Sequence, residues 1–112
     1  MSFDTKIQDG IAIMRITVAR LDANVAPELK KEVNDIVAGG TSRIMVDLKD
    51  VEFMDSSGLG AIVACFKLTG QKGDFVLCNM NEAVTEIFAL THMDSLFDIY
   101  PDADEGFQKM CA

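Results

Sequence analysis

The sequence predicts an α/β domain with a mixed, mostly parallel sheet, an antiparallel strand at its N-terminal side and about four helices. Two apolar segments at the start of the chain are joined by a two-residue turn. Segments of helical periodicity then alternate with short apolar segments typical of buried strands. Strands separated by helices are joined by parallel crossovers, so the expected order is β-β-α-β-α-β-α-β-α. We expect residues 1–112 to form a single domain.

The first two predicted strands cover residues 3–8 and 11–19. Asp9-Gly10 between them is typical of a two-residue hairpin turn, because both positions of that turn favour a left-handed backbone. Side chains alternate between two faces along the second strand. One face carries Ile11, Ile13, Arg15 and Thr17, and the other carries Ala12, Met14, Ile16 and Val18.

Pro27 then predicts the first position of a helix, where the missing N–H of proline costs nothing. Gly39 and Gly40 predict the end of this helix. Residues 44–48 are largely apolar and predict a buried central strand. The apolar face of the helix is formed by Leu29, Val33, Ile36 and Val37.

The second half of the chain continues the alternation. A helix follows the segment 55–60, a turn at Lys72-Gly73-Asp74 opens a strand at 75–78, and Asn81 is a typical cap for a third helix. A last strand covers 96–100, and a C-terminal helix begins after Pro101. The apolar face of the first of these helices carries Leu59, Ile62, Val63 and Phe66. That of the third predicted helix carries Val84, Ile87, Phe88 and Thr91, and that of the C-terminal helix carries Ala103, Phe107, Met110 and Cys111.

Composition excludes several classes of function. The formal net charge of −8 argues against nucleic acid as a partner, since phosphate binding needs a basic face. The sequence has neither an apolar segment of membrane-spanning length nor the pattern of a signal peptide, so we expect a cytoplasmic protein without a membrane partner. Cys65 and Cys78 lie in apolar segments, and with Cys111 and a single histidine they offer no metal site or cofactor site.

Motifs of common enzymes are also absent from the sequence. It contains no nucleophile elbow, no phosphate-binding loop with its lysine, and no complete dinucleotide-binding glycine pattern. Any nucleophilic pair would have to use His92, whose place near a helix end is more typical of a surface or capping residue. We therefore expect no catalytic residues.

The segment Asp55-Ser56-Ser57-Gly58-Leu59-Gly60 stands at the start of the second predicted helix. A purely structural interpretation is available, because Asp or Ser can cap the helix and the glycines allow a tight turn and close packing. Two adjacent hydroxyls are unusual there, since one suffices for a cap. The other would face solvent at the positive end of the helix, where a phosphate is tolerated.

This segment, with Met54 before it and the strand at 44–48, resembles the signature of STAS domains, specifically the bacterial anti-sigma factor antagonists. The element order and the length of the chain match that family throughout. Leu21-Asp22-Ala23 before the first helix, and Asn79 before the third, also fall where the family has similar residues.

The resemblance implies a partner switch. In the family, the serine after the motif Asp is phosphorylated by a partner that is both an anti-sigma factor and a serine kinase of the histidine-kinase-like ATPase type. The unmodified protein binds and sequesters this partner, phosphorylation releases it, and a serine phosphatase resets the system. Carried over, the phosphorylated residue is Ser56, and the partner-binding residues are Asp22, Asp55, Ser56, Ser57, Gly58 and Leu59.

One position departs from the family pattern. The family often has Gly-Glu-Leu-Asp before the first helix, whereas this chain has Ala19-Arg20-Leu21-Asp22. Arg20 thus replaces an acid beside the expected docking face, which leaves the identity of the partner open.

Other functions remain open from sequence. A partner-switch component could control an output other than a sigma factor, such as biofilm formation or secretion. A STAS module could instead bind a small ligand, lipid or nucleotide, with Ser56 only capping its helix. A small-molecule enzyme is the remaining alternative, and His92→Ala would test it.

Overall fold

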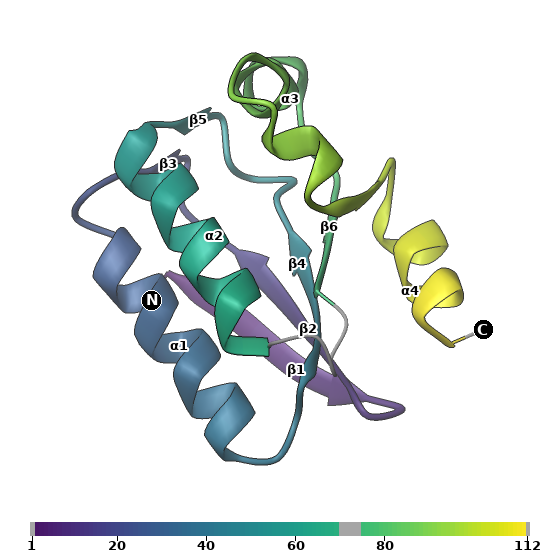
Figure 1. Cartoon of the computed structure of the whole chain (residues 1–112). Coiled ribbons are helices and arrows are strands. Elements are labelled where there is room, and N and C mark those ends of the chain that lie inside the picture. Colours follow the sequence, from purple (N-terminus) through teal and green to yellow (C-terminus); the bar gives the residue numbers. More distant parts are fainter. Residues whose placement is uncertain (1, 70–74, 112) are drawn as a thin grey trace.

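The computed structural model describes residues 2–69 and 75–111, and it confirms the predicted α/β fold (Figure 1). The predicted turn at Lys72–Asp74 lies outside the described residues. The elements in chain order are β1 (Phe3–Gln8), β2 (Ile11–Ile16), β3 (Arg20–Leu21), α1 (Ala26–Ala38), β4 (Arg43–Asp47), β5 (Phe53–Met54), α2 (Ser56–Thr69), β6 (Phe75–Cys78), α3 (Glu82–Leu90), the 3-10 helix η1 (Met93–Ser95), β7 (Asp98–Tyr100) and α4 (Ala103–Cys111).

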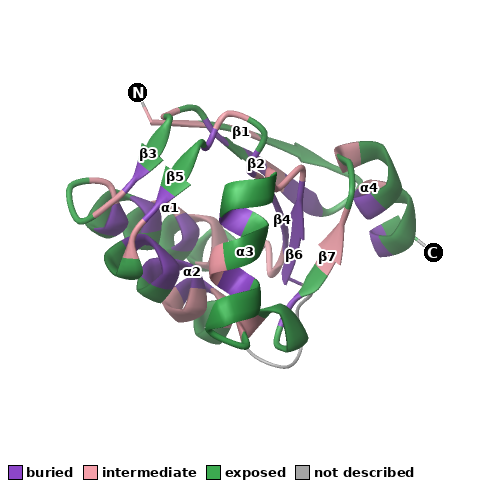
Figure 2. Ribbon diagram, turned by 90° about the horizontal axis from the view of Figure 1, so that it is seen from above, coloured by how far each residue is buried: buried purple, intermediate pink, exposed green. Residues whose placement is uncertain are grey.

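The main sheet has five strands in the order β1-β2-β4-β6-β7. β1 pairs with β2 antiparallel, and the other neighbours are parallel, as predicted. Asp9 and Gly10 connect β1 to β2 with φ of 53° and 76°, which is the left-handed backbone expected for this turn. Helices α1, α2 and α3 cover one face of the sheet, and α4 covers the other (Figure 2).

Strand residues alternate between two apolar clusters, one on each face of the sheet. Ala12, Met14 and Ile16 of β2 belong to the larger cluster, which includes the buried residues of α1, α2 and α3. Ile11 belongs to the smaller cluster, and Ile13 packs against it under α4. The alternation predicted for the second strand is therefore confirmed over the residues of β2.

The second strand was predicted to continue to residue 19, which is wrong, because β2 ends at Ile16. The chain then leaves the main sheet to form a second, two-stranded parallel sheet from β3 and β5. Ala19 directs this change, since its carbonyl oxygen accepts hydrogen bonds from the backbone N–H groups of Glu52 and Phe53, at 2.7 and 3.0 Å. Figure 1 places this small sheet beside the first turn of α2.

Helix boundaries agree closely with the capping residues. Asn81 caps α3 as predicted, because its Oδ1 accepts a hydrogen bond from the Val84 N–H at 2.8 Å. Helix α1 begins at Ala26, one residue before Pro27. The last strand starts at Asp98 and not at residue 96, because Leu96 caps the C-terminal end of η1 with helical backbone angles, φ −84° and ψ −30°.

Candidate functional site

Asp55 caps helix α2. Its carboxylate oxygen Oδ1 accepts a hydrogen bond from the Gly58 N–H at 2.9 Å, and its carbonyl oxygen accepts the first helical bond from Leu59 N at 3.0 Å. This is the geometry of an N-cap residue. Of the residues that could have capped the helix, the aspartate does so, and the capping role therefore does not require either serine.

Ser56 and Ser57 occupy the first two positions of α2 and are both exposed. Neither hydroxyl takes part in any hydrogen bond of the described residues. The N–H groups of the first helical turn give this end of α2 a partial positive charge. A negatively charged group on either serine would therefore be stabilised by the helix without disturbing an existing contact.

The small sheet brings Asp22 to the same end of the molecule as Asp55. Leu21 of β3 is the register partner of Met54 of β5, and the Asp55 N–H donates to the Leu21 carbonyl oxygen at 3.3 Å. Asp22 follows Leu21 and Asp55 follows Met54, so the two aspartates come directly after residues that are paired with each other. Asp22 also fixes the turn into α1, because its Oδ1 accepts from the Asn24 N–H at 3.0 Å.

The six residues predicted to bind the partner divide into two groups. Asp22, Asp55, Ser56 and Ser57 are exposed or half-buried, whereas Gly58 and Leu59 are buried. A Cβ on Gly58 would overlap the Leu21 carbonyl oxygen, so only glycine allows β3 to pass this close to α2. Gly58 and Leu59 thus hold the site in place from beneath.

Arg20 and Phe53 belong to the same surface and were not predicted as site residues. They are register partners in the small sheet. The guanidinium carbon of Arg20 lies 4.5 Å from the centre of the Phe53 ring, and Nε lies 3.8 Å from Asp22 Oδ2. The sequence contained one indication of this part of the surface, because Arg20 stands where the family often has an acidic residue. The pairing of Arg20 with Phe53 could not be inferred from sequence, since strands of two residues show no periodicity.

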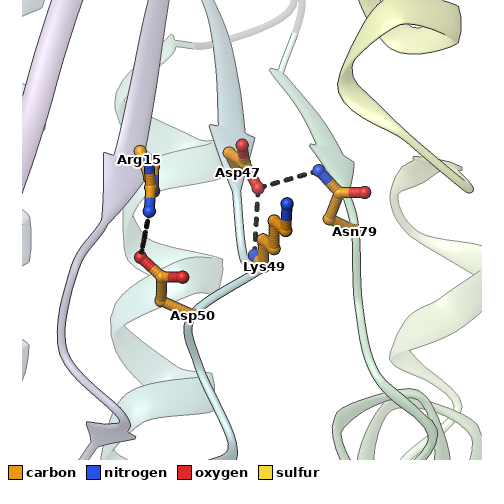
Figure 3. A network of polar contacts seen from close by, with 5 residues as sticks. All are labelled: Arg15, Asp47, Lys49, Asp50 and Asn79. Atoms are coloured by element: carbon orange, nitrogen blue, oxygen red, sulfur yellow. Dashed lines mark hydrogen bonds and ion pairs between the residues drawn. The ribbon is translucent and has the colours of Figure 1, made fainter.

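A second polar cluster lies at the carboxyl ends of the parallel strands (Figure 3). Asp47 Oδ1 accepts hydrogen bonds from the Lys49 N–H at 2.9 Å and from Asn79 Nδ2 at 3.0 Å. Arg15 donates to Asp50 at 2.7 Å, and this contact raises the pKa of the arginine. The bond between Asp47 and Asn79 joins the ends of β4 and β6, so Asn79 has a role in connecting strands.

The molecule is hollowed on the face of α4, away from the serines. A cleft of about 430 Å³ lies between α4 and the face of β1, β2 and β4 on which it packs. Lys6, Arg15, Asp47 and Phe107 are among its lining residues, and none of the six predicted site residues is. The volume is within the range of small-ligand pockets.

The described residues contain no group of three or more side chains arranged to hold a metal ion. None of the helices within residues 2–69 and 75–111 is long and apolar enough to cross a membrane.

Cys65 and Cys78 are buried, and desolvation raises the pKa of each thiol to about 12.

Comparison with known proteins identifies the family. The STAS domain model matches residues 2–106, so the chain belongs to the STAS domain family. The anti-sigma-B factor antagonist of Bacillus subtilis is 28% identical over 110 residues, which covers 96% of this chain and 100% of that protein. This chain is thus related over its length to bacterial anti-sigma factor antagonists.

Solved structures agree with this assignment. The crystal structure of a putative anti-sigma factor antagonist from Thermotoga maritima is 32% identical and superposes with a TM-score of 0.92, covering 98% of this chain and 95% of that one. The Bacillus cell fate determinant SpoIIAA in its phosphorylated form has the same fold, with a TM-score of 0.73 over 96% of this chain and 97% of that one, at 16% identity.

Proposed function

We propose that this protein is an anti-sigma factor antagonist of the cytoplasm, formed by one STAS domain over residues 1–112 and switched by phosphorylation of Ser56. The unmodified form binds and sequesters an anti-sigma factor that is also a serine kinase of the histidine-kinase-like ATPase type. Phosphorylation releases that partner, and a serine phosphatase restores the unmodified form. The protein itself performs no catalysis in this scheme.

One observation carries the proposal. Asp55 supplies the cap of α2, so the Ser56 hydroxyl is exposed at the start of the helix with no structural hydrogen bond to lose. The resemblance of Asp55-Ser56-Ser57-Gly58 to the signature of the anti-sigma factor antagonists, to which this chain is related, favours Ser56 over its neighbour. SpoIIAA, a protein of the same fold, is known in a phosphorylated form.

The effect of phosphorylation follows from charge. A phosphate adds about −1.5 to −2 at pH 7 beside Asp55, on a chain whose formal net charge is already −8. In the free protein, solvent and the N-terminal end of α2 offset this charge, so the fold is retained. In a complex the phosphate loses its water and must face the partner's own surface, so association weakens.

The test is calorimetric titration of the partner kinase, recovered by co-purification from the native bacterium, with three variants of the chain. Ser56→Asp should bind at least about tenfold more weakly than the parent chain. Ser56→Ala should bind like the parent and resist inactivation by ATP. Ser56→Asn is the matched control, because it has the size of Asp without the charge, and it should bind more tightly than Ser56→Asp.

Equal affinities for Ser56→Asp and Ser56→Asn would contradict the electrostatic switch. The identity of the co-purified chains also separates the remaining alternatives. A kinase of this type that binds no sigma factor would indicate another output, such as biofilm formation. Recovery of a bound small molecule, with no change in mass at Ser56, would favour a ligand-binding module that uses the cleft beside α4.

A further inference from the structure

The pair formed by Arg20 and Phe53 has features that its structural role does not require. The Phe53 side chain belongs to a residue that is 40% exposed, although aromatic residues in strands normally lie against a core. Arg20 covers one side of this ring, with its own side chain 66% exposed. Its separation of 3.8 Å from Asp22 is longer than a hydrogen bond, so the guanidinium N–H groups remain available to another acceptor.

The pair lies close enough to Ser56 to be covered by a partner that docks there. Phe53 precedes Ser56 by three residues, which span at most about 10 Å of chain. Arg20 is its register partner on the neighbouring strand, about 5 Å away. A standard interface covers about 800 Å² on each partner, equivalent to a disc of about 16 Å radius. An interface of this size centred on Ser56 is therefore large enough to include both residues.

Covering them has different consequences for the two side chains. Phe53 contributes apolar area, and partly exposed aromatic residues are frequent anchors of interfaces. Arg20 becomes a buried cation whose N–H groups need acceptors, since a desolvated charge without a partner is costly. The Asp22 carboxylate is near but not hydrogen-bonded to it. The missing acceptor must then come from the partner.

We propose that Arg20 and Phe53 form a specificity element of the docking surface, and that it selects a partner presenting a carboxylate beside an apolar depression. The carboxylate would accept hydrogen bonds from the Arg20 guanidinium, and the depression would receive the Phe53 ring. The acidic groups around Ser56, namely Asp22 and Asp55, call for basic residues on the rest of the partner's surface. This proposal rests on the proposed function, because it assumes that Ser56 is covered by the kinase.

Calorimetric titration of the co-purified kinase with variants of the unmodified chain tests the proposal. Arg20→Glu should weaken binding by about tenfold or more, and Arg20→Gln should weaken it less, since only Glu adds repulsion. Phe53→Ala should also weaken binding by about tenfold. The loss in Arg20→Glu should become smaller at high salt, whereas that in Phe53→Ala should not.

The chain offers a matched control for each variant. Lys109→Glu makes the same charge change on α4, on the far side of the sheet from the small sheet (Figure 2). Leu68→Ala removes an apolar side chain from a residue that is 41% exposed, close to the 40% of Phe53, at the other end of α2. Both controls should bind within about twofold of the parent chain.

The proposal is overturned if Arg20→Glu and Phe53→Ala melt like the parent chain and bind the kinase as tightly as the controls do. In that case, phosphorylation of Ser56 by the same kinase would leave the proposed function standing. Failure of the parent chain to bind the kinase at all, with no phosphate on Ser56, would overturn both. A variant whose melting temperature falls is replaced by Arg20→Gln or Phe53→Leu, which change the side chain less.

Discussion

Gly58 provides the sharpest test of how the site is held in place. An ideal Cβ built on this residue overlaps the Leu21 carbonyl oxygen and lies 3.0 Å from both the carbonyl carbon and Cγ of Leu21. Leu21 is fully buried, and its carbonyl oxygen also accepts a hydrogen bond from Asp55 N. The overlap is with backbone, so it cannot be relieved by a side-chain rotation. Gly58→Ala must therefore separate β3 from the first turn of α2.

The cost can be worked out from these contacts. Overpacking a tight site costs about 1–3 kcal/mol. Separation of β3 from α2 also weakens the bond from Asp55 N to Leu21 O, which contributes about 1 kcal/mol. We expect Gly58→Ala to lower the free energy of unfolding by about 2–4 kcal/mol, which is about 10 °C or more in melting temperature. Gly58→Val should cost more, and both variants should reduce phosphorylation of Ser56.

Thermal and urea unfolding measure this effect, with Gly60→Ala as the matched control. Gly60 lies two residues further along α2, and a Cβ there meets no atom within 4 Å. That variant should be as stable as the parent or gain about 0.5–1 kcal/mol from the higher helix propensity of alanine. Ser56→Ala should also melt like the parent chain. If Gly58→Ala has the same free energy of unfolding as Gly60→Ala, the close approach of β3 to α2 does not require glycine at position 58, and the reasoning is refuted.

Further predictions concern the third helix and the thiols. Asn81→Ala should cost about 1–2 kcal/mol in urea unfolding, because Asn81 Oδ1 caps Val84 N and its Nδ2 donates to Val51 O at 3.0 Å, and a loss below about 0.3 kcal/mol would contradict this. Ellman's reagent should modify only Cys111 in the folded protein and all three cysteines after unfolding, since Cys65 and Cys78 are buried, and rapid native modification of either would contradict the packing. The folded state keeps the protons of these two thiols up to a pKa of about 12, whereas the unfolded chain releases them near 9.0. Between these values the unfolded state binds fewer protons, so the free energy of unfolding should fall as the pH rises, less steeply in a Cys65→Ala, Cys78→Ala double variant.

Sequence predicted most of the fold because its signals are local. Asp9-Gly10 defines the first hairpin, Asn81 caps α3, and the apolar segments 75–78 and 44–48 match strands β6 and β4 to within a residue. Each of these features follows from the conformational preference of a few neighbouring residues.

The small sheet and the cap of α2 could not be predicted in the same way. Strands β3 and β5 contain two residues each and owe their conformation to pairing across more than thirty residues of chain, as between Leu21 and Met54. Likewise, the sequence allowed Asp or Ser to cap α2, and only the contact from Gly58 N to Asp55 Oδ1 distinguishes them. The contact between Arg20 and Phe53 depends on the same long-range pairing.

The central claim is that Ser56 is the residue that the switch modifies. The measurement is site-resolved phosphopeptide mapping after incubation of the chain with ATP and the co-purified kinase, for the parent chain and for Ser56→Ala and Ser57→Ala. We predict a gain of about 80 Da on Ser56 in the parent chain and in Ser57→Ala, and none in Ser56→Ala. Phosphate on Ser57, or a Ser56→Ala variant that is modified as fast as the parent chain, would contradict the account.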